Sequence, residues 1–125
     1  MILVTGGLGY IGSFTLKLLS KNKAVSIDNL SRGNRFAKKF CLNINTNIQN
    51  KQKIIKIVKK YKIKTVLHLA AYTCVRESKK KPKIYKKNNL INQKIFFKNI
   101  INLGIKKIIF ASSYSAYGYN TNKKE

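Results

Sequence analysis

Four glycines fall within seven consecutive residues near the start of the chain, in the stretch Gly6-Gly7-Leu8-Gly9-Tyr10-Ile11-Gly12. The apolar run Ile2–Val4 precedes them and residues at helical spacing follow, so the glycines occupy the turn between a strand and a helix. Glycines in this context let backbone N–H groups approach a dinucleotide pyrophosphate and let the helix pack against the strand. The partial positive charge at the helix N-terminus adds to the attraction for phosphate.

Asp28 lies about twenty residues after the glycine turn, at the end of a second apolar run. A carboxylate there accepts hydrogen bonds from a ribose 2′-hydroxyl and repels a 2′-phosphate, which favours NAD over NADP. No Lys-Ser or Lys-Thr pair follows the glycines, so the motif is not a nucleotide-hydrolysing P-loop. The alternative is a glycine-rich turn in an unrelated strand–turn–helix unit.

Two further strand ends carry residues that could contact a ligand. Leu69-Ala70-Ala71 would let a flat cofactor lie against the backbone, whereas the preceding His68 is expected to be a packed strand residue and not a base. Ser112-Ser113 follow the last apolar run and would point into a nicotinamide cleft. The lysine runs Lys79–Lys81 and Lys86-Lys87 are expected to be solvated helix faces.

Short apolar runs alternate with longer amphipathic stretches along the chain. The apolar runs predict strands at Ile2–Val4, Ala24–Ile27, Phe40–Ile44, Thr65–Ala70 and Ile108–Ala111. Residues at helical spacing predict three helices, through Ile11, Phe14, Leu18 and Leu19, through Ile54, Val58 and Tyr61, and from Pro82 through Ile84, Ile91, Ile95 and Ile101. Gly104 is the expected stop of the last helix, and Ser31 to Lys39 is basic and loop-like.

Strands that alternate with helices predict a single α/β domain over residues 1–125, built on a parallel sheet. Near-continuous apolar strands such as Thr65–Ala70 indicate a sheet covered on both faces. The right-handed crossover rule favours a doubly wound, Rossmann-type order near 3-2-1-4-5. Ligands bind such sheets at the carboxyl ends of the strands, which selects Gly6–Gly12, Asp28, Asn43, Leu69–Thr73 and Ser112-Ser113.

The chain is strongly basic, with 27 Lys and Arg residues, 3 Asp and Glu residues and a formal net charge of +24. Such a charge favours nonspecific, salt-dependent binding to nucleic acid. Biased base composition is the alternative explanation, because Lys, Asn and Ile can all be written with A/T-only codons. Biased base composition is the preferred explanation of the charge. Arginine is confined to Arg32, Arg35 and Arg76, and the lysines are scattered along the chain.

Cys41 and Cys74 are too few for a disulfide framework, and no CxxC motif or His/Cys cluster indicates a metal site. The first apolar run is too short for a signal peptide or a membrane-spanning helix. These features predict a cytoplasmic protein with no membrane partner.

The chain carries a further set of segments in a fixed order: Val4–Ser13, Asp28–Ser31, Val66–Ala71, Glu77-Ser78, Pro82, Asn88-Asn89 and Phe110–Gly118. This set resembles the UDP-glucose 4-epimerase family, which belongs to the extended short-chain dehydrogenases/reductases, over nearly the whole chain. The resemblance implies NAD as cofactor, a UDP-sugar as substrate and a homodimer.

The resemblance also implies roles for individual residues. Those expected to contact the cofactor are Gly6, Gly9, Tyr10, Ile11 and Gly12 at the glycine turn, Asp28, Asn29, Leu30 and Ser31 (with the rest of the segment to Gly33) on the adenosine side, Asn43 and Ile44 beside the adenine, Leu69, Ala70, Ala71 and Thr73 near the nicotinamide ribose, and Asn88 on the next helix. Ser113 would hydrogen-bond the sugar hydroxyl that is oxidised.

Some positions depart from the family pattern. Asn43 stands where the family usually has Asp, Thr73 where it usually has Lys, and Phe14 where it usually has His. The segment before Asn43 is also short for the family.

The family's chemistry needs a Tyr-x-x-x-Lys pair on a helix beyond the serine strand, where the tyrosine takes the hydroxyl proton. Tyr119 and Lys123 match the string, but they follow Ser113 too closely and enclose Asn-Thr-Asn, a poor helix former. The chain is therefore expected to be the cofactor-binding part of an epimerase and inactive alone. Residues 1–125 would form an incomplete NAD-binding Rossmann domain, cut before its catalytic helix, its last strands and the substrate domain. The alternatives are part of another extended-family sugar-nucleotide dehydratase or decarboxylase, and a polycation that binds nucleic acid nonspecifically.

Overall fold

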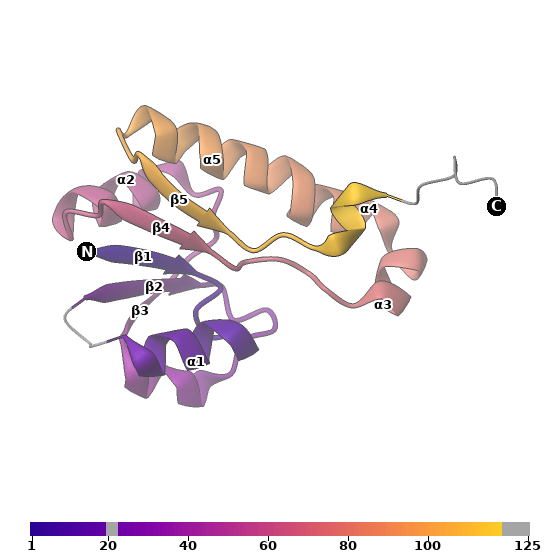
Figure 1. The fold of residues 1–125 in the computed structure, drawn as a ribbon, viewed down its shortest axis with the longest axis horizontal. Helices are drawn as coiled ribbons and strands as arrows, with labels where there is room; N and C mark the ends of the chain where they lie inside the picture. The colour runs from indigo at the N-terminus through magenta and orange to yellow at the C-terminus, as the bar shows by residue number, and fades with distance from the viewer. Residues whose placement is uncertain (20–22, 119–125) are drawn as a thin grey trace.

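Five short strands form one parallel sheet in the computed structural model, which describes residues 1–19 and 23–118 (Figure 1). The strands are β1 (Ile2–Thr5), β2 (Ala24–Asp28), β3 (Leu42–Asn45), β4 (Thr65–His68) and β5 (Lys107–Phe110). Their order is β3-β2-β1-β4-β5, and every neighbouring pair is parallel. The predicted doubly wound, Rossmann-type sheet is confirmed.

The register of the sheet brings the carboxyl ends of the strands to one edge. Thr5 of β1 lies opposite Ile27 of β2 and His68 of β4, and His68 lies opposite Phe110 of β5. The loops that leave β2 and β4 therefore flank the loop that leaves β1. This arrangement places the glycine turn in the middle of the edge.

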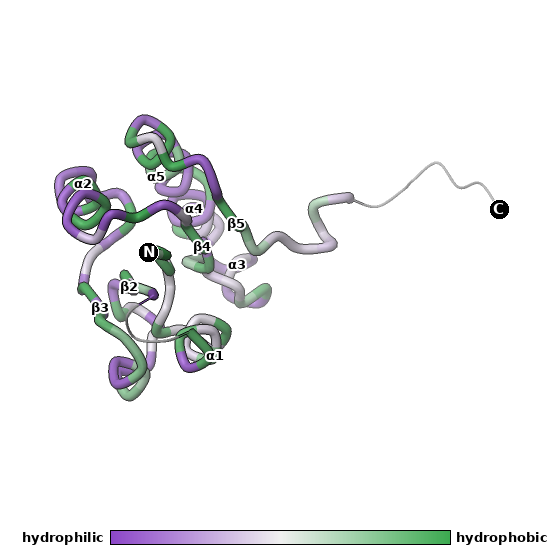
Figure 2. The backbone as a smooth tube through the Cα atoms, turned by 60° about the vertical axis from the view of Figure 1, so that its left-hand side comes forward, coloured by the Kyte–Doolittle hydropathy of each residue, from purple (hydrophilic) through white to green (hydrophobic). Residues whose placement is uncertain are grey.

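Helices lie on both faces of the sheet (Figures 1 and 2). On one face, Leu16 of α1 (Tyr10–Leu18) packs near Val4, beside the 3-10 helix η1 (Arg35–Phe40). On the other face, α2 (Lys51–Lys60) and α5 (Asn92–Asn102) bury Ile54, Phe96 and Ile100 in a larger apolar core. Each fully buried side chain of this size contributes roughly 1.5–3 kcal/mol.

The buried face of α1 is not the one that its apolar residues suggest. Gly12 and Leu16 face the sheet, whereas Ile11, Phe14 and Leu18 are 62%, 56% and 87% exposed. The cause is steric: Gly12 contacts the backbone of the glycine turn, which fixes the rotation of the helix about its axis.

The last long helix also buries a face other than the one formed by the apolar residues that predicted it. Gln93, Phe96, Asn99 and Ile100 form the buried face of α5. The four isoleucines that indicated this helix in the sequence are all at least 42% exposed: Ile84, Ile91, Ile95 and Ile101.

The prediction of a sheet covered on both faces is correct for its centre and wrong for its two edge strands, since Leu42 of β3 is 50% exposed. β2 is buried along its whole length. In β5, by contrast, Ile109 and Phe110 are each 49% exposed. Among residues 1–19 and 23–118, β5 has no neighbouring strand on its outer side.

Several boundaries differ from the sequence-based expectations. β4 ends at His68, two residues early, and the predicted loop contains η1. No bounds were predicted for the short helix α3 (Val75–Lys80), although Lys79–Lys81 were expected to lie on a helix face. The predicted helix after Pro82 consists of α4 (Pro82–Lys86), a π-helical turn η2 (Lys87–Ile91) and α5. It ends before Gly104, whose φ of 78° confirms the predicted stop.

In the described ranges, no helix has the length and apolar character needed to cross a membrane. The same residues contain no group of three His, Cys, Asp or Glu side chains that could hold a metal. Cys41 is buried and Cys74 exposed, and neither forms a disulfide in this part of the chain. Burial raises the pKa of the Cys41 thiol.

Candidate functional site

The glycine turn is a close-packed backbone structure at the carboxyl end of β1. Gly6 has a φ of 67°, and its carbonyl accepts a hydrogen bond of 3.0 Å from the Gly9 N–H. A Cβ on Gly12 would lie 2.3 Å from the Gly6 oxygen, and a Cβ on Gly6 would lie 2.9 Å from the Ala70 backbone. Side chains are therefore excluded at both positions, and the N-terminus of α1 stays close to the turn.

Asp28 connects this turn to the loop after β2. Its buried carboxylate accepts a hydrogen bond of 3.1 Å from the Leu8 N–H through Oδ2 and one of 2.7 Å from the Leu30 N–H through Oδ1. A carboxylate has about four acceptor positions, so two remain for a ligand. Asp28 thus shapes the loop and still presents acceptor oxygens.

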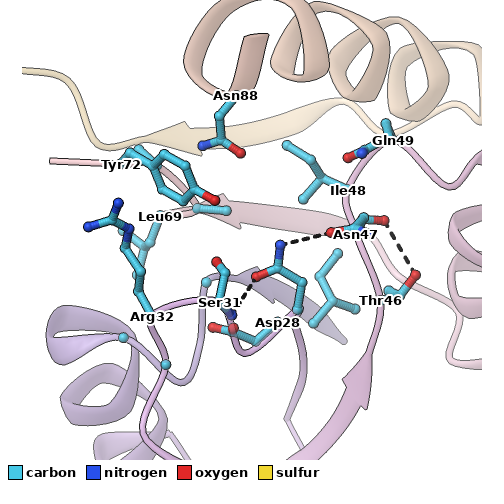
Figure 3. A pocket seen from close by; sticks show the side chains of 17 residues that line it. Asp28, Ser31, Arg32, Thr46, Asn47, Ile48, Gln49, Leu69, Tyr72 and Asn88 are labelled. Atoms are coloured by element: carbon cyan, nitrogen blue, oxygen red, sulfur yellow. Dashed lines mark hydrogen bonds between the residues drawn. The ribbon is translucent and has the colours of Figure 1, made fainter. Parts of the chain in front are cut away.

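A cleft opens where these loops meet the loop after β4 (Figure 3). The space between its lining atoms, open solvent included, is about 640 Å³. Eleven of the residues predicted to bind the cofactor line it: Gly6, Gly9, Asp28, Asn29, Ser31, Arg32, Gly33, Leu69, Ala70, Ala71 and Asn88. A glycine cradle, a carboxylate and a small-residue wall together fit a dinucleotide.

Five other predicted residues do not line the cleft. Tyr10 and Ile11 are 82% and 62% exposed on the outer side of α1, and Gly12 is buried beneath the turn. Leu30, at a φ of 60°, contributes its N–H to Asp28, while Thr73 lies exposed beyond Tyr72.

Asn43 and Ile44, predicted to lie beside the adenine, are not among the residues that line the cleft. The Asn43 side chain accepts a hydrogen bond of 2.8 Å from the Ser26 hydroxyl, and Ile44 packs against the core. The wall is formed instead by Asn47 and Ile48, four residues further on. The sequence repeats Asn-Ile at the two places, and choosing the second pair lengthens the segment that looked short for the family.

Hydrogen bonds hold this wall against the loop after β2. Asn29 Nδ2 donates to Asn47 Oδ1 at 2.8 Å, and the Ser31 N–H donates to Asn29 Oδ1 at 3.0 Å (Figure 3). Thr46 and Gln49 complete the wall. The residues that sequence reasoning missed therefore adjoin those it found.

The opposite wall is fixed by amide side chains of the following helical segment. Asn89 accepts from the Tyr72 N–H at 2.9 Å and donates to the Tyr72 carbonyl at 2.7 Å. Gln93 Nε2 donates to the Ala70 carbonyl at 3.2 Å. The π-helical turn η2 contains both residues at this point of the chain: Asn88, which lines the cleft, and Asn89, which holds Tyr72.

His68 is a packed residue, as predicted. It is 1% exposed, and the rings of Phe96, Phe97 and Phe110 surround it at centroid distances of 4.9–5.8 Å. Burial lowers the pKa of His68 to about 4. The imidazole is therefore neutral at physiological pH.

Ser113 lies beyond the end of β5 and does not line the cleft. Its Oγ accepts a hydrogen bond of 3.3 Å from the Ser115 N–H and caps the 3-10 helix η3 (Tyr114–Tyr117). Tyr119 and Lys123, which were rejected as a catalytic pair, lie outside the described residues.

A charged cluster occupies the end of the cleft nearest Tyr72. The Arg32 guanidinium forms an ion pair with Glu77 and lies 4.3 Å from the centroid of the Tyr72 ring. Glu77 also accepts from the Tyr85 hydroxyl at 3.0 Å and lies 3.5 Å from Lys81 Nζ. The hydrogen bond from Arg32, with support from Tyr85, lowers the pKa of the Glu77 carboxyl, and the same bond raises the pKa of Arg32.

The chain is similar to known proteins over nearly its whole length. It is 37% identical to a UDP-glucose 4-epimerase from Halalkalibacterium halodurans and 38% identical to one from Cyamopsis tetragonoloba, in each case over 94% of this chain. The structure of UDP-glucose 4-epimerase from Brucella ovis in complex with NAD superposes with a TM-score of 0.87, at 32% identity over 94% of this chain and 37% of that one.

The chain spans 36% and 37% of the lengths of the two curated relatives. Residues 2–125 match the family described as NAD dependent epimerase/dehydratase. The glycine turn, Asp28 and the sheet order described above all lie inside this match. The chain belongs to the NAD dependent epimerase/dehydratase family.

Proposed function

We propose that this chain binds NAD and is the cofactor-binding part of a UDP-glucose 4-epimerase. The observation that carries the proposal is that Gly6, Gly9 and Asp28 line one cleft although they come from the loops after two different strands. The proposal is supported by the two relatives named above, which are UDP-glucose 4-epimerases, and by the family to which the chain belongs.

Each part of the cleft receives a role in this proposal. The glycine turn faces the pyrophosphate, and Asp28 accepts from the adenosine ribose. Asn47 and Ile48 lie beside the adenine, and the Leu69–Ala71 wall lies beside the nicotinamide ribose. NAD, when bound, supplies the acceptor for a hydride from the sugar.

Ser113 is the proposed partner of the sugar hydroxyl. It follows β5, and β5 lies next to β4, so it belongs to the same edge of the sheet as the cleft. Its hydroxyl is exposed and can reorient toward a ligand. We further propose that the whole protein interconverts UDP-glucose and UDP-galactose as a cytoplasmic homodimer, and the free Cys41 and Cys74 agree with a reducing compartment.

Titration calorimetry with NAD and NADP tests the cofactor proposal without altering the protein. NAD should bind at least about tenfold more tightly than NADP, because the 2′-phosphate would meet the Asp28 carboxylate. Asp28→Asn should reduce this preference, and its thermal unfolding shows whether the two loops remain in place. Absence of heat with millimolar NAD would overturn the proposal.

Catalysis is tested separately with the purified 125-residue chain and UDP-glucose. We expect NAD binding without formation of UDP-galactose, since the chain spans 36% of the bacterial relative. Turnover by the purified chain would contradict this expectation and would make Tyr119 a candidate acid/base.

Nucleic-acid binding is not favoured as the function. The net charge of +24 predicts weak, sequence-independent retention of DNA that falls steeply with salt. Gel retardation at low and physiological ionic strength checks this. Affinity that persists at physiological salt and depends on sequence would restore the alternative.

A further inference from the structure

One side-chain contact joins the loops on the two sides of the glycine turn. Arg32 belongs to the loop after β2, whereas its partners Tyr72 and Glu77 follow β4. Because β1 lies between β2 and β4, a contact between these loops has to cross the end of β1. Figure 3 shows Arg32 and Tyr72 next to each other at one end of the cleft.

The charges at this contact are unusual for the chain. Arg32 is the only basic residue among the described residues that line the cleft. The sequence has 3 acidic residues, of which Asp28 lines the cleft, Glu77 binds Arg32, and Glu125 lies outside the described residues. In a chain with 27 basic residues and 3 acidic ones, the Glu77 carboxylate thus pairs with Arg32, the basic residue of the cleft lining.

Both ends of the contact are fixed by local hydrogen bonds. On one side, Asp28 holds the Leu30 N–H, and the Asn34 N–H donates to the Leu8 carbonyl at 2.8 Å. On the other side, Asn89 holds both backbone groups of Tyr72. The part that can move is the Arg32 side chain, which is 43% exposed and has flexible methylene groups.

Resting on the function proposed above, we propose that Arg32 is a cofactor-retaining residue, whose side chain forms a strap with Tyr72 and Glu77 over the pyrophosphate of bound NAD. The strap opens by rotation of one side chain and does not need the loops to separate. A guanidinium above the glycine turn also adds a positive charge opposite the two phosphates, at a site where the turn itself offers only N–H groups.

Dissociation of NADH, followed by stopped-flow fluorescence during displacement with excess NAD, tests the strap. Arg32→Ala should raise the dissociation rate on the order of tenfold, as expected for loss of a charge-assisted contact. Arg32→Lys should recover only part of the retention, because an ammonium cannot reach Glu77 and a phosphate with the same planar fork. Glu77→Gln should raise the rate less than Arg32→Ala, and the double variant should resemble Arg32→Ala alone.

Arg35→Ala is the matched control. Arg35 lies three residues away on η1, is exposed and does not line the cleft, and its replacement changes the net charge by the same amount. Equal dissociation rates for the Arg32→Ala and Arg35→Ala variants would overturn the strap while leaving NAD binding intact. A change confined to the association rate would also overturn it, since Arg32 would then only attract the cofactor. Absence of NADH binding by the unaltered chain would overturn the proposed function together with the strap.

A second measurement detects the strap in the chain without cofactor. Arg32, Tyr85 and Lys81 face the Glu77 carboxylate, and together they lower its pKa, with the Arg32 hydrogen bond as the largest cause. Arg32→Ala should therefore raise the pKa of Glu77 toward its ordinary value, as read from the side-chain carboxyl carbon by NMR. An unchanged titration would show that Arg32 and Glu77 are not paired in solution, and would overturn the strap independently of any binding result.

Discussion

Thr5 and His68 stand opposite each other on β1 and β4, joined by a hydrogen bond of 2.8 Å between Oγ1 and Nδ1. The same Thr5 oxygen accepts from the N–H groups of Leu69 and Ala70, both at 3.2 Å. With its lone pairs used by two amides, the hydroxyl donates its proton to Nδ1, which places the imidazole proton on Nε2. One hydroxyl group thus fixes the tautomer of a buried histidine and the start of one wall of the cleft.

Replacement of this hydroxyl should be costly. Thr5→Val keeps the shape of the side chain but leaves the Ala70 N–H and His68 Nδ1 without their partner, whereas the Leu69 N–H keeps the Thr5 carbonyl at 3.1 Å. The free energy of unfolding should therefore fall by about 2 kcal/mol. Thr5→Ser retains the oxygen and should lose less than about 1 kcal/mol. Urea unfolding of both variants provides the comparison, and equal losses would mean that the methyl group, and not the hydroxyl, carries the effect.

The stability of the chain should depend on pH through His68. Burial lowers its pKa from 6.5 to about 4, so between these values the unfolded chain binds a proton that the folded chain does not. The free energy of unfolding is therefore not reduced by His68 above pH 6.5. It falls as the pH is lowered from 6.5 toward 4, by at most about 3 kcal/mol.

His68→Phe removes this titration while retaining an aromatic ring among the three phenylalanines. The loss of unfolding free energy between pH 7 and pH 4.5 should therefore be smaller in the variant than in the unaltered chain. His68 is the one histidine of the sequence, so its imidazole titration can also be followed directly by NMR. An imidazole pKa near 6.5 would contradict the buried, neutral state.

Two glycines should respond differently to alanine. Gly12→Ala would place a Cβ 2.3 Å from the Gly6 oxygen, which the backbone can relieve only by moving α1 away from the turn. We expect a loss of about 3 kcal/mol or more, together with loss of NAD binding. Gly104→Ala meets open space and should cost only about 1 kcal/mol for its φ of 78°, with NAD binding unchanged. Thermal unfolding and calorimetry separate the two outcomes, and similar behaviour of both variants would refute the role of the turn.

The two Asn-Ile pairs give a direct test of which one borders the cofactor. Asn47→Ala should weaken NAD binding several-fold, because Asn47 lines the cleft and holds Asn29. Asn43→Ala leaves the Ser26 hydroxyl without its acceptor and should cost about 1 kcal/mol of stability with no change in NAD affinity. The reverse pattern would restore the pair first chosen from the sequence.

The sheet could be predicted from the sequence because its strands are short apolar runs separated by polar or glycine-containing segments. The central part of the cleft could be predicted as well, since Gly6, Gly9 and Asp28 occupy positions that a mechanical argument specifies. Strand order then followed from the handedness of crossover connections.

What the sequence did not reveal depends on contacts between distant segments. Periodicity identified α1 as a helix, but its rotation is set by the contact of Gly12 with the glycine turn. Nothing in the local sequence distinguishes Asn43-Ile44 from Asn47-Ile48. Which pair lines the cleft depends on how far the segment after η1 extends past the end of β2. The pairing of Arg32 with Glu77 joins residues 45 positions apart and has no local signature.

The apolar side chains left uncovered on α1 and β5 have a consequence for how copies of this chain behave toward one another. At a net charge of +24, copies repel each other at low ionic strength despite these surfaces. Salt shortens the range of that repulsion from about 10 Å at 0.1 M to about 3 Å at 1 M, while the attraction between apolar patches remains. We therefore expect the chain to behave as a charge-stabilised colloid, dispersed in dilute buffer and clustering as salt is added, which light scattering across a salt series would measure.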